Sequence, residues 1–147
     1  MGTTRSGFTL IEMMTAITVM GTAAAMAFPQ VAVTVSHARV NQAATVAAGE
    51  FEMASSLADR QRKPVRITVD PSYKTIVIAD RSTGAILSEK KYGLVSEYRL
   101  SRLIGVPAQI DIFPNGTVSG SLRLTMQIDN YVRHVTMTRA GQVRVTP

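Results

Sequence analysis

The sequence predicts an α+β protein in which one long, kinked N-terminal helix precedes a small antiparallel β domain. Three observations lead to this prediction. Residues 8–28 are almost entirely apolar or small, residues 40–57 repeat apolar side chains at helical spacing, and the chain after Pro64 alternates apolar and polar residues between turn signals. In a chain of 147 residues, one compact domain of about 85 residues remains after such a helix, enough for a modest core.

The first half of the helix has the length and polarity of a membrane span. The stretch from residue 13 to residue 38 contains no Asp, Glu, Lys or Arg. A helix over residues 8–28 would be roughly 31 Å long, close to the hydrocarbon thickness of a bilayer. We therefore expect residues 8–30 to form a transmembrane half. Glu12 lies near its start, and because a carboxylate in a membrane costs on the order of 2–3 kcal/mol, it indicates a functional position with a partner.

The second half of the helix, residues 31–62, is amphipathic instead. Pro29 removes a helical hydrogen bond and clashes with the preceding turn, so a kink is expected near Phe28. Pro64 should end the helical region, since the residue before a proline favours extended structure. Apolar residues recur at spacings of three and four on one face: Val40, Ala43, Ala44, Ala47, Phe51, Ala54 and Leu57.

Residues 64–147 read as short strands joined by turns. The alternating patterns and turn signals predict strands near residues 65–69, 75–79, 85–89, 110–112, 121–128, 131–138 and 142–145. The turn signals include Asp70-Pro71-Ser72, Pro114-Asn115-Gly116 and Asp129-Asn130. Residues 92–104 fit either a strand or a loop. We expect a β-rich globular domain over this range.

Composition and motifs argue against an enzyme. The sequence contains no cysteine, so disulfides and thiol chemistry are excluded, and its two histidines, His37 and His134, have no partner at metal-ligand spacing. No nucleophile elbow, P-loop or dinucleotide fingerprint is present. We therefore expect no catalytic residue, no metal and no cofactor. A net charge of +6 favours acidic partners without selecting one.

Two routes of processing compete at the N-terminus. Ala25-Met26-Ala27 has the small-x-small form of a signal peptidase site behind Arg5 and an apolar run. Cleavage after Ala27 would release a secreted periplasmic β domain. Glu12 interrupts the start of the apolar region, however, and Arg5 is the only positive charge before it, and both features disfavour a conventional signal peptide.

Residues Gly7-Phe8-Thr9-Leu10-Ile11-Glu12, followed by the uncharged span, resemble the N-terminus of type IV pilin-like proteins, which comprise pilins, minor pilins and the pseudopilins of type II secretion. The resemblance implies a leader over residues 1–7, cleavage between Gly7 and Phe8 by prepilin peptidase, and N-methylation of Phe8. It also makes Glu12 the assembly residue, whose carboxylate would neutralise the α-amine of a neighbouring subunit, because pairing offsets the desolvation of both charges. Many members also carry a kinking proline at the position of Pro29.

The C-terminal half resembles the GspH/FimT-type subgroup, through the Phe113-Pro114-Asn115-Gly116 turn and a last hairpin running to Val145. That subgroup has a long helix and a β domain of two sheets and acts near the filament tip. Some FimT-like members are thought to bind DNA through a Gly-Arg-x-Arg segment, which here reads Gly-Gln-Val-Arg at residues 141–144, without its first arginine. DNA binding is therefore an alternative, for which the basic candidates are Arg123, Arg133, Arg139 and Arg144.

The sequence thus predicts a minor pilin or pseudopilin of a type IV pilus or a type II secretion pseudopilus. Its expected partners are prepilin peptidase, other pilins or pseudopilins that pack on the N-terminal helix, and the lipid of the inner membrane. The expected topology is a single pass through the bacterial inner membrane with the C-terminal domain in the periplasm. Both machines share every feature used above, so the choice between them, the exported substrate and the position in the filament stay open.

Overall fold

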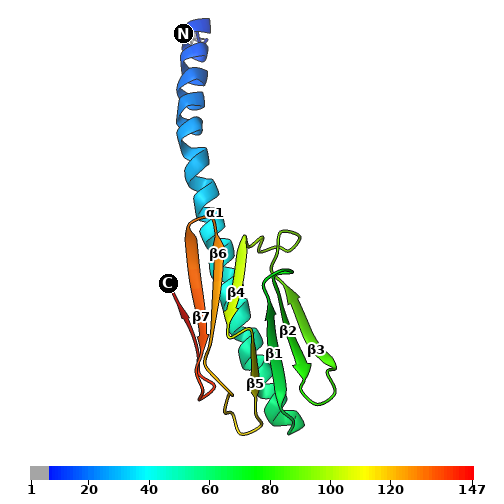
Figure 1. The fold of residues 1–147 in the computed structure, drawn as a ribbon. Helices are drawn as coiled ribbons and strands as arrows, with labels where there is room; N and C mark the ends of the chain where they lie inside the picture. Colours follow the sequence, from blue (N-terminus) through cyan, green and yellow to red (C-terminus); the bar gives the residue numbers. More distant parts are fainter. Residues whose placement is uncertain (1–6) are drawn as a thin grey trace, which may run out of the picture. The chain divides into compact units, whose positions relative to one another are not determined.

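A long helix and eight strands make up the fold of this computed structural model, which describes residues 7–147 except for the side chains of residues 26–29. The helix α1 runs from Leu10 to Gln61 (Figure 1). The chain divides into two compact units at the boundary between Val35 and Ser36, so that α1 contributes to both. The second unit, Ser36–Pro147, contains all the strands.

Local signals explain where α1 ends. Arg62 adopts a left-handed conformation with φ of 52°, the backbone N–H of Lys63 donates to the carbonyl of Ala58 at 3.3 Å, and that of Arg62 donates to Asp59 at 3.2 Å. These two bonds form a Schellman motif, which satisfies carbonyls that the helix leaves free. Pro64 follows at once and prevents a further turn. Pro29 lies inside the assigned helix, among the side chains left undescribed, and the kink there stays a prediction.

The strands form two antiparallel sheets of four, which confirms the expected α+β class with a two-sheet domain. The first sheet has the order β3-β2-β1-β5 and the second the order β4-β6-β7-β8. The strand bounds are β1 Val65–Asp70, β2 Thr75–Asp80, β3 Ile86–Lys91, β4 Arg102–Val106, β5 Gln109–Ile112, β6 Leu122–Ile128, β7 Tyr131–Met137 and β8 Val143–Thr146. The ambiguous stretch from residue 92 to 104 holds a loop and the start of β4.

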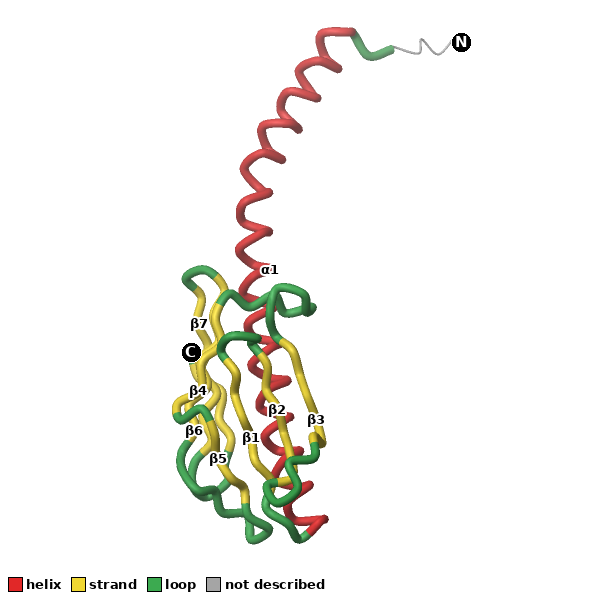
Figure 2. Tube along the Cα trace, turned by 45° about the vertical axis from the view of Figure 1, so that its right-hand side comes forward, coloured by secondary structure: helices red, strands yellow, loops and turns green. Residues whose placement is uncertain are grey.

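One core joins the helix to both sheets, and Figures 1 and 2 show the C-terminal part of α1 running along them. Six of the seven residues in the predicted stripe are buried, from Val40 to Ala54, but Leu57 is only partly buried and Ala58 takes its place. The stripe is rich in alanine, which lets the sheets approach the helix closely. The period-two burial of β1 and β6 matches the predicted alternation.

The two sheets meet at β1 and β4, where Gly105 faces Val69. A Cβ placed on Gly105 would lie 2.8 Å from Cγ2 and 2.9 Å from Cβ of Val69, closer than side chains can pack. Gly105 is therefore needed for this contact rather than for a special backbone conformation. The peptide bond between Val106 and Pro107, just after β4, is cis.

Candidate functional site

The N-terminal segment begins with a capped helix. The backbone N–H of Glu12 donates to Oγ1 of Thr9 at 3.3 Å, and the N–H of Thr9 donates to Oε2 of Glu12 at 3.5 Å. This reciprocal pair is a capping box, in which Thr9 is the N-cap and Glu12 satisfies the cap's own backbone. Sequence reasoning missed the role of Thr9, although Thr-x-x-Glu before an apolar run is a readable signal.

Beyond the cap, α1 presents an apolar surface that no other described residue covers. The large apolar side chains from Phe8 to Met20 are 54–81% exposed. The hydroxyls of Thr15, Thr18 and Thr22 donate to carbonyls one turn back along the helix, at 2.7, 2.8 and 3.1 Å. Because their hydroxyls are satisfied within the helix, these threonines can enter an apolar environment at low cost. Among the described residues, α1 is the one helix whose length and composition would allow it to cross a membrane.

Gly7 precedes the helix and has no role in the described fold. A Cβ placed on Gly7 would meet no described atom within 4 Å, and its φ is not in the left-handed region. The fold therefore tolerates a side chain at this position. The remainder of the expected leader, residues 1–6, including Arg5, lies outside the described residues.

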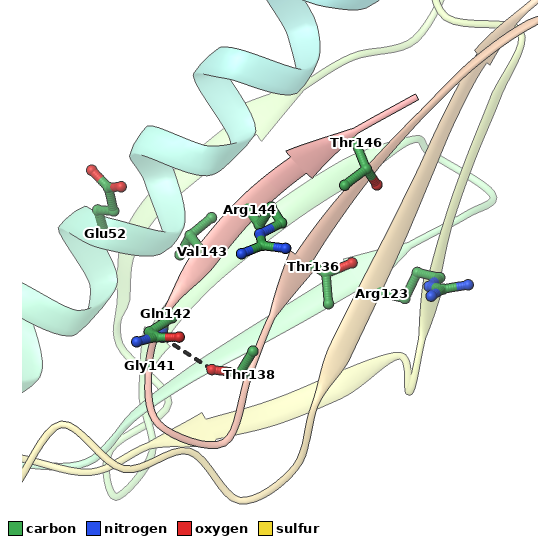
Figure 3. A pocket seen from close by; sticks show the side chains of 9 residues that line it. All are labelled: Glu52, Arg123, Thr136, Thr138, Gly141, Gln142, Val143, Arg144 and Thr146. Carbon is green, nitrogen blue, oxygen red and sulfur yellow. Dashed lines mark hydrogen bonds between the residues drawn. The ribbon is translucent and has the colours of Figure 1, made fainter.

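A second candidate surface is the open face of the β4-β6-β7-β8 sheet. On β6, Arg123 lies between the buried Leu122 and Leu124, and so points away from the core. Arg123 pairs across the strands with Thr136, and Thr136 pairs with Arg144. Figure 3 shows these three side chains along the open face, with Glu52 of α1 at its edge. The row spans three strands, so the backbone positions of Arg123 and Arg144 lie about 10 Å apart.

The structure separates the four arginines that the sequence grouped. Arg133 falls on the same side of β7 as the buried Val135 and Met137, and its Nε donates to Oδ1 of Asn41 on α1 at 2.7 Å. Arg139 lies in the exposed turn after β7. Of these four arginines, Arg123 and Arg144 share the open face. His134 also lies there, with Nδ1 3.1 Å from Oγ1 of Thr125.

His37, the other histidine, lies on α1 at the start of the second unit. Its ring stacks on that of Tyr131, with 3.8 Å between centroids and 19° between planes. The hydroxyl of Tyr131 in turn donates to Oδ1 of Asn41 at 3.1 Å. His37 thus joins α1 to β7 rather than taking part in a reactive cluster. Among residues 7–147, no group of three or more His, Cys, Asp or Glu side chains is placed to hold a metal.

Two comparisons with known proteins found similarity, one to a family model at the N-terminus and one to solved structures over most of the chain. Residues 3–28 match the family model described as a prokaryotic N-terminal methylation motif. Two crystal structures of the type IV minor pilin FimU from Pseudomonas aeruginosa share the fold. The first has a TM-score of 0.58 at 18% identity over 73% of this chain and 92% of FimU, and the second has 0.60 at 19% over 74% and 88%. No curated protein matches the chain.

The methylation motif and the fold occur together in one chain. The motif stands at the head of one long helix, and the helix is followed by a small antiparallel domain of two sheets, the fold shared with the type IV minor pilin FimU. A pilin-type methylation motif implies processing by prepilin peptidase and assembly with other pilins.

Proposed function

We propose that this protein is a minor pilin of a type IV pilus, cleaved after Gly7, N-methylated at Phe8 and incorporated near the filament tip. The observation that carries the proposal is the exposed apolar helix with one carboxylate, Glu12, at its start. A helix of this kind needs lipid before assembly and other helices after it. The likeness to FimU, which is described as a type IV minor pilin, favours the pilus over the type II secretion pseudopilus.

In the proposed cycle, residues 8–30 span the inner membrane and the β domain lies in the periplasm. Cleavage creates an α-amine at Phe8, and Glu12 of a neighbouring subunit neutralises it inside the helical bundle. Methylation leaves the charge of that amine intact, so the pair survives the modification. The pairing would set the axial register between subunits, since two buried charges satisfy each other at one offset only.

The capping box makes it possible to separate two roles of Glu12. Glu12→Gln keeps an N3 side chain that can bond to the cap but removes the charge that would pair with the amine. Thr9→Ala removes the cap, at a cost of about 1 kcal/mol of helix stability, and keeps the charge. We expect Glu12→Gln to be cleaved normally and to disappear from purified filaments, and Thr9→Ala to be cleaved and incorporated.

The measurement is the intact mass of each variant in membranes, with its abundance in sheared filaments. Incorporation of Glu12→Gln at the level of the unchanged protein would contradict the charge pairing. Gly7→Glu is the processing control: the fold tolerates a side chain there, so retention of residues 1–7 would reflect the peptidase alone. A chain that begins at Phe28 would instead support the secreted β domain. Loss of pili on deletion, with secretion intact, would favour the pilus over the type II machine.

A second function is supported by the charge of the β4-β6-β7-β8 sheet. Its four strands contain Arg102, Arg123, Arg133 and Arg144 and no Asp or Glu. We propose that the open face, through Arg123 and Arg144, binds the phosphates of DNA without reading its sequence. This is a narrower site than the four arginines expected from the sequence.

A further inference from the structure

One end of the second unit brings together three segments that are distant in sequence. The turn between β1 and β2 contacts the loop between β3 and β4 there, since the N–H of Tyr92 donates to the carbonyl of Lys74 at 2.8 Å. That loop leads into β4, whose first residue Arg102 is in register with Gln127, which is in register with Val132 at the start of β7. β7 contacts α1 at Asn41. This is therefore the end at which α1 enters the unit (Figure 1).

The most exposed apolar side chains of the β domain project from this end. Leu94 and Val95 form the tip of a tight turn, closed by the N–H and the hydroxyl of Ser96, which both donate to the carbonyl of Gly93 at 3.0 and 2.7 Å. Leu94 is 67% exposed, Val95 is fully exposed, and Tyr73 beside them is 80% exposed. Turn tips are ordinarily polar, so two apolar residues there indicate a contact with something apolar. We call these three residues the apolar corner.

The loop that carries the apolar corner is firmly anchored. Tyr92, Tyr98 and Leu100 on either side of the turn are buried, the rings of Tyr92 and Tyr98 lie 5.2 Å apart, and the N–H of Leu100 donates to the carbonyl of Tyr92 at 2.9 Å. Burial raises the pKa of Tyr98 to about 12, which agrees with its position beneath the turn. The anchored loop keeps Leu94 and Val95 in solvent.

The charges around the apolar corner suit a lipid surface. Lys74 and Lys91 line the same depression as Tyr73, Leu94 and Val95. Lys91 has its Nζ 3.6 Å from Oε1 of Glu89, and Glu97 lies farther along the loop, so the corner is only weakly cationic. Aliphatic residues with tyrosine and lysine at their edge are typical of the boundary between acyl chains and headgroups.

We propose that the apolar corner inserts into the periplasmic surface of the inner membrane while the subunit awaits assembly. The proposal rests on the membrane span proposed above, because the same end of the unit receives the helix from that span. Ser36 follows residue 30, the end of the proposed span, by a helical path of about 9 Å. The headgroup layer of one leaflet is about 5–8 Å deep, so the chain keeps the start of the unit within reach of the membrane surface. A second contact besides the span would restrict the rotation of the domain about its helix.

The test uses the full chain, which has no cysteine, so that each introduced cysteine carries the only label. An environment-sensitive fluorophore is placed on Val95→Cys, with two controls in the domain. Ile86→Cys is also exposed and apolar but lies at the opposite end of the first sheet, and Asn130→Cys lies in the β6–β7 turn at the same end as Val95. Ile17→Cys in the apolar helix reports insertion of the span.

The proteins are reconstituted at low density in vesicles of phosphatidylcholine and phosphatidylglycerol that contain a lipid-borne nitroxide quencher. We expect the labels on Ile17→Cys and Val95→Cys to lose most of their fluorescence, and those on Ile86→Cys and Asn130→Cys to keep it. Adding Lys74→Gln and Lys91→Gln to Val95→Cys should reduce its quenching.

Several results would overturn the inference. Quenching of Val95→Cys no stronger than that of Ile86→Cys would show that the corner stays in water. Equal quenching at Asn130→Cys would show that tethering alone brings this end near lipid. A change at Val95→Cys that appears only as protein density rises would identify a second copy of the chain as the partner. If Ile17→Cys is not quenched, the membrane span is wrong, and both the proposed function and the contact of the apolar corner fail. If Ile17→Cys is quenched and Val95→Cys is not, only the contact of the apolar corner is wrong.

Discussion

At the residue scale, Asp80 shows how a single carboxylate organises a turn. It ends β2, and its Oδ1 accepts hydrogen bonds from the N–H of Ser82 at 2.7 Å, from the N–H of Thr83 at 3.0 Å and from the hydroxyl of Ser82. These bonds, led by the Ser82 hydroxyl, favour the ionised form and lower the pKa of Asp80 to about 2. The turn between β2 and β3 is therefore coupled to the protonation of this carboxylate.

This coupling predicts a pH dependence of stability. The folded pKa of Asp80 lies below its unfolded value of about 3.9, so its stabilising effect is complete above about pH 4 and is lost as the pH falls towards 2. Asp80→Asn keeps an oxygen acceptor but cannot titrate. We expect the melting temperature of the full chain in detergent to fall less between pH 4 and pH 2 in this variant.

The slope of melting temperature against pH is measured by circular dichroism for Asp80→Asn and for the unchanged protein. A constant difference between their melting temperatures from pH 5 to pH 7 is the internal control. Asp111 also contributes to the remaining slope. Its pKa is lowered mainly by Arg66, whose Nε lies 2.7 Å from Oδ1, with Arg81 at 3.2 Å from Oδ2. Identical slopes in Asp80→Asn and the unchanged protein would exclude the proposed role of Asp80.

At the element scale, the contact between β1 and β4 depends on the absence of one side chain. Gly105→Ala would place a methyl group 2.8–3.2 Å from the side-chain carbons of Val69, which forces the two strands apart. Such overpacking costs about 1–3 kcal/mol. We expect this loss in the free energy of unfolding, measured by urea denaturation of the full chain in detergent.

The matching substitution tests the cause. Val69→Ala removes the atoms that the new methyl group would meet, so the double variant should be more stable than the sum of the two single variants implies. The coupling should have the size of the overpacking cost. Strictly additive effects would show that Gly105 is needed for another reason.

Helices and strands could be predicted where apolar residues recur on one face, and less well where tertiary contacts determine the local structure. The alanine-rich stripe of α1 and the alternation in β1, β6 and β7 follow directly from periodicity. The stretch from residue 92 to 104 does not, because Tyr92, Tyr98 and Leu100 are buried by anchoring a loop rather than by a repeating pattern. Gly105 and Pro107 further weaken the strand signal of β4, although β4 is paired with β6 along its whole length.

The two candidate sites also differ in how far they could be predicted from the sequence. The processing and assembly segment is contiguous, so Gly7, Phe8 and Glu12 could be named from the sequence, and their roles stay proposals. The open face depends on strand pairing, which joins Arg123 to Arg144 through Thr136, and linear sequence does not specify that pairing. The alternation of side chains along a strand could nevertheless have shown that Arg133 does not lie on the open face, because it shares a side of β7 with Val135 and Met137.

At the scale of the whole molecule, charge is divided between the two sheets. The strands of the first sheet carry four carboxylates, Asp70, Asp80, Glu89 and Asp111, beside three cations. The second sheet carries arginines and no carboxylate. A polyanion that approaches the domain is therefore attracted more strongly to the strands of the second sheet. Glu52 limits the field at the edge of that sheet near β8.

This division predicts how DNA binding should respond to substitution. Arg123→Gln with Arg144→Gln removes two cations that would neutralise phosphates, so affinity should fall for every DNA sequence, and the slope of log affinity against log salt should decrease by about 0.9 for each phosphate that is no longer neutralised. Arg60→Gln with Arg62→Gln changes the net charge equally at the C-terminal end of α1 and should leave the slope unchanged. The measurement is fluorescence anisotropy of labelled duplexes with the full chain in detergent, at several salt concentrations. Equal reductions in both double variants would mean that net charge alone attracts DNA, and the open face would then have no specific role.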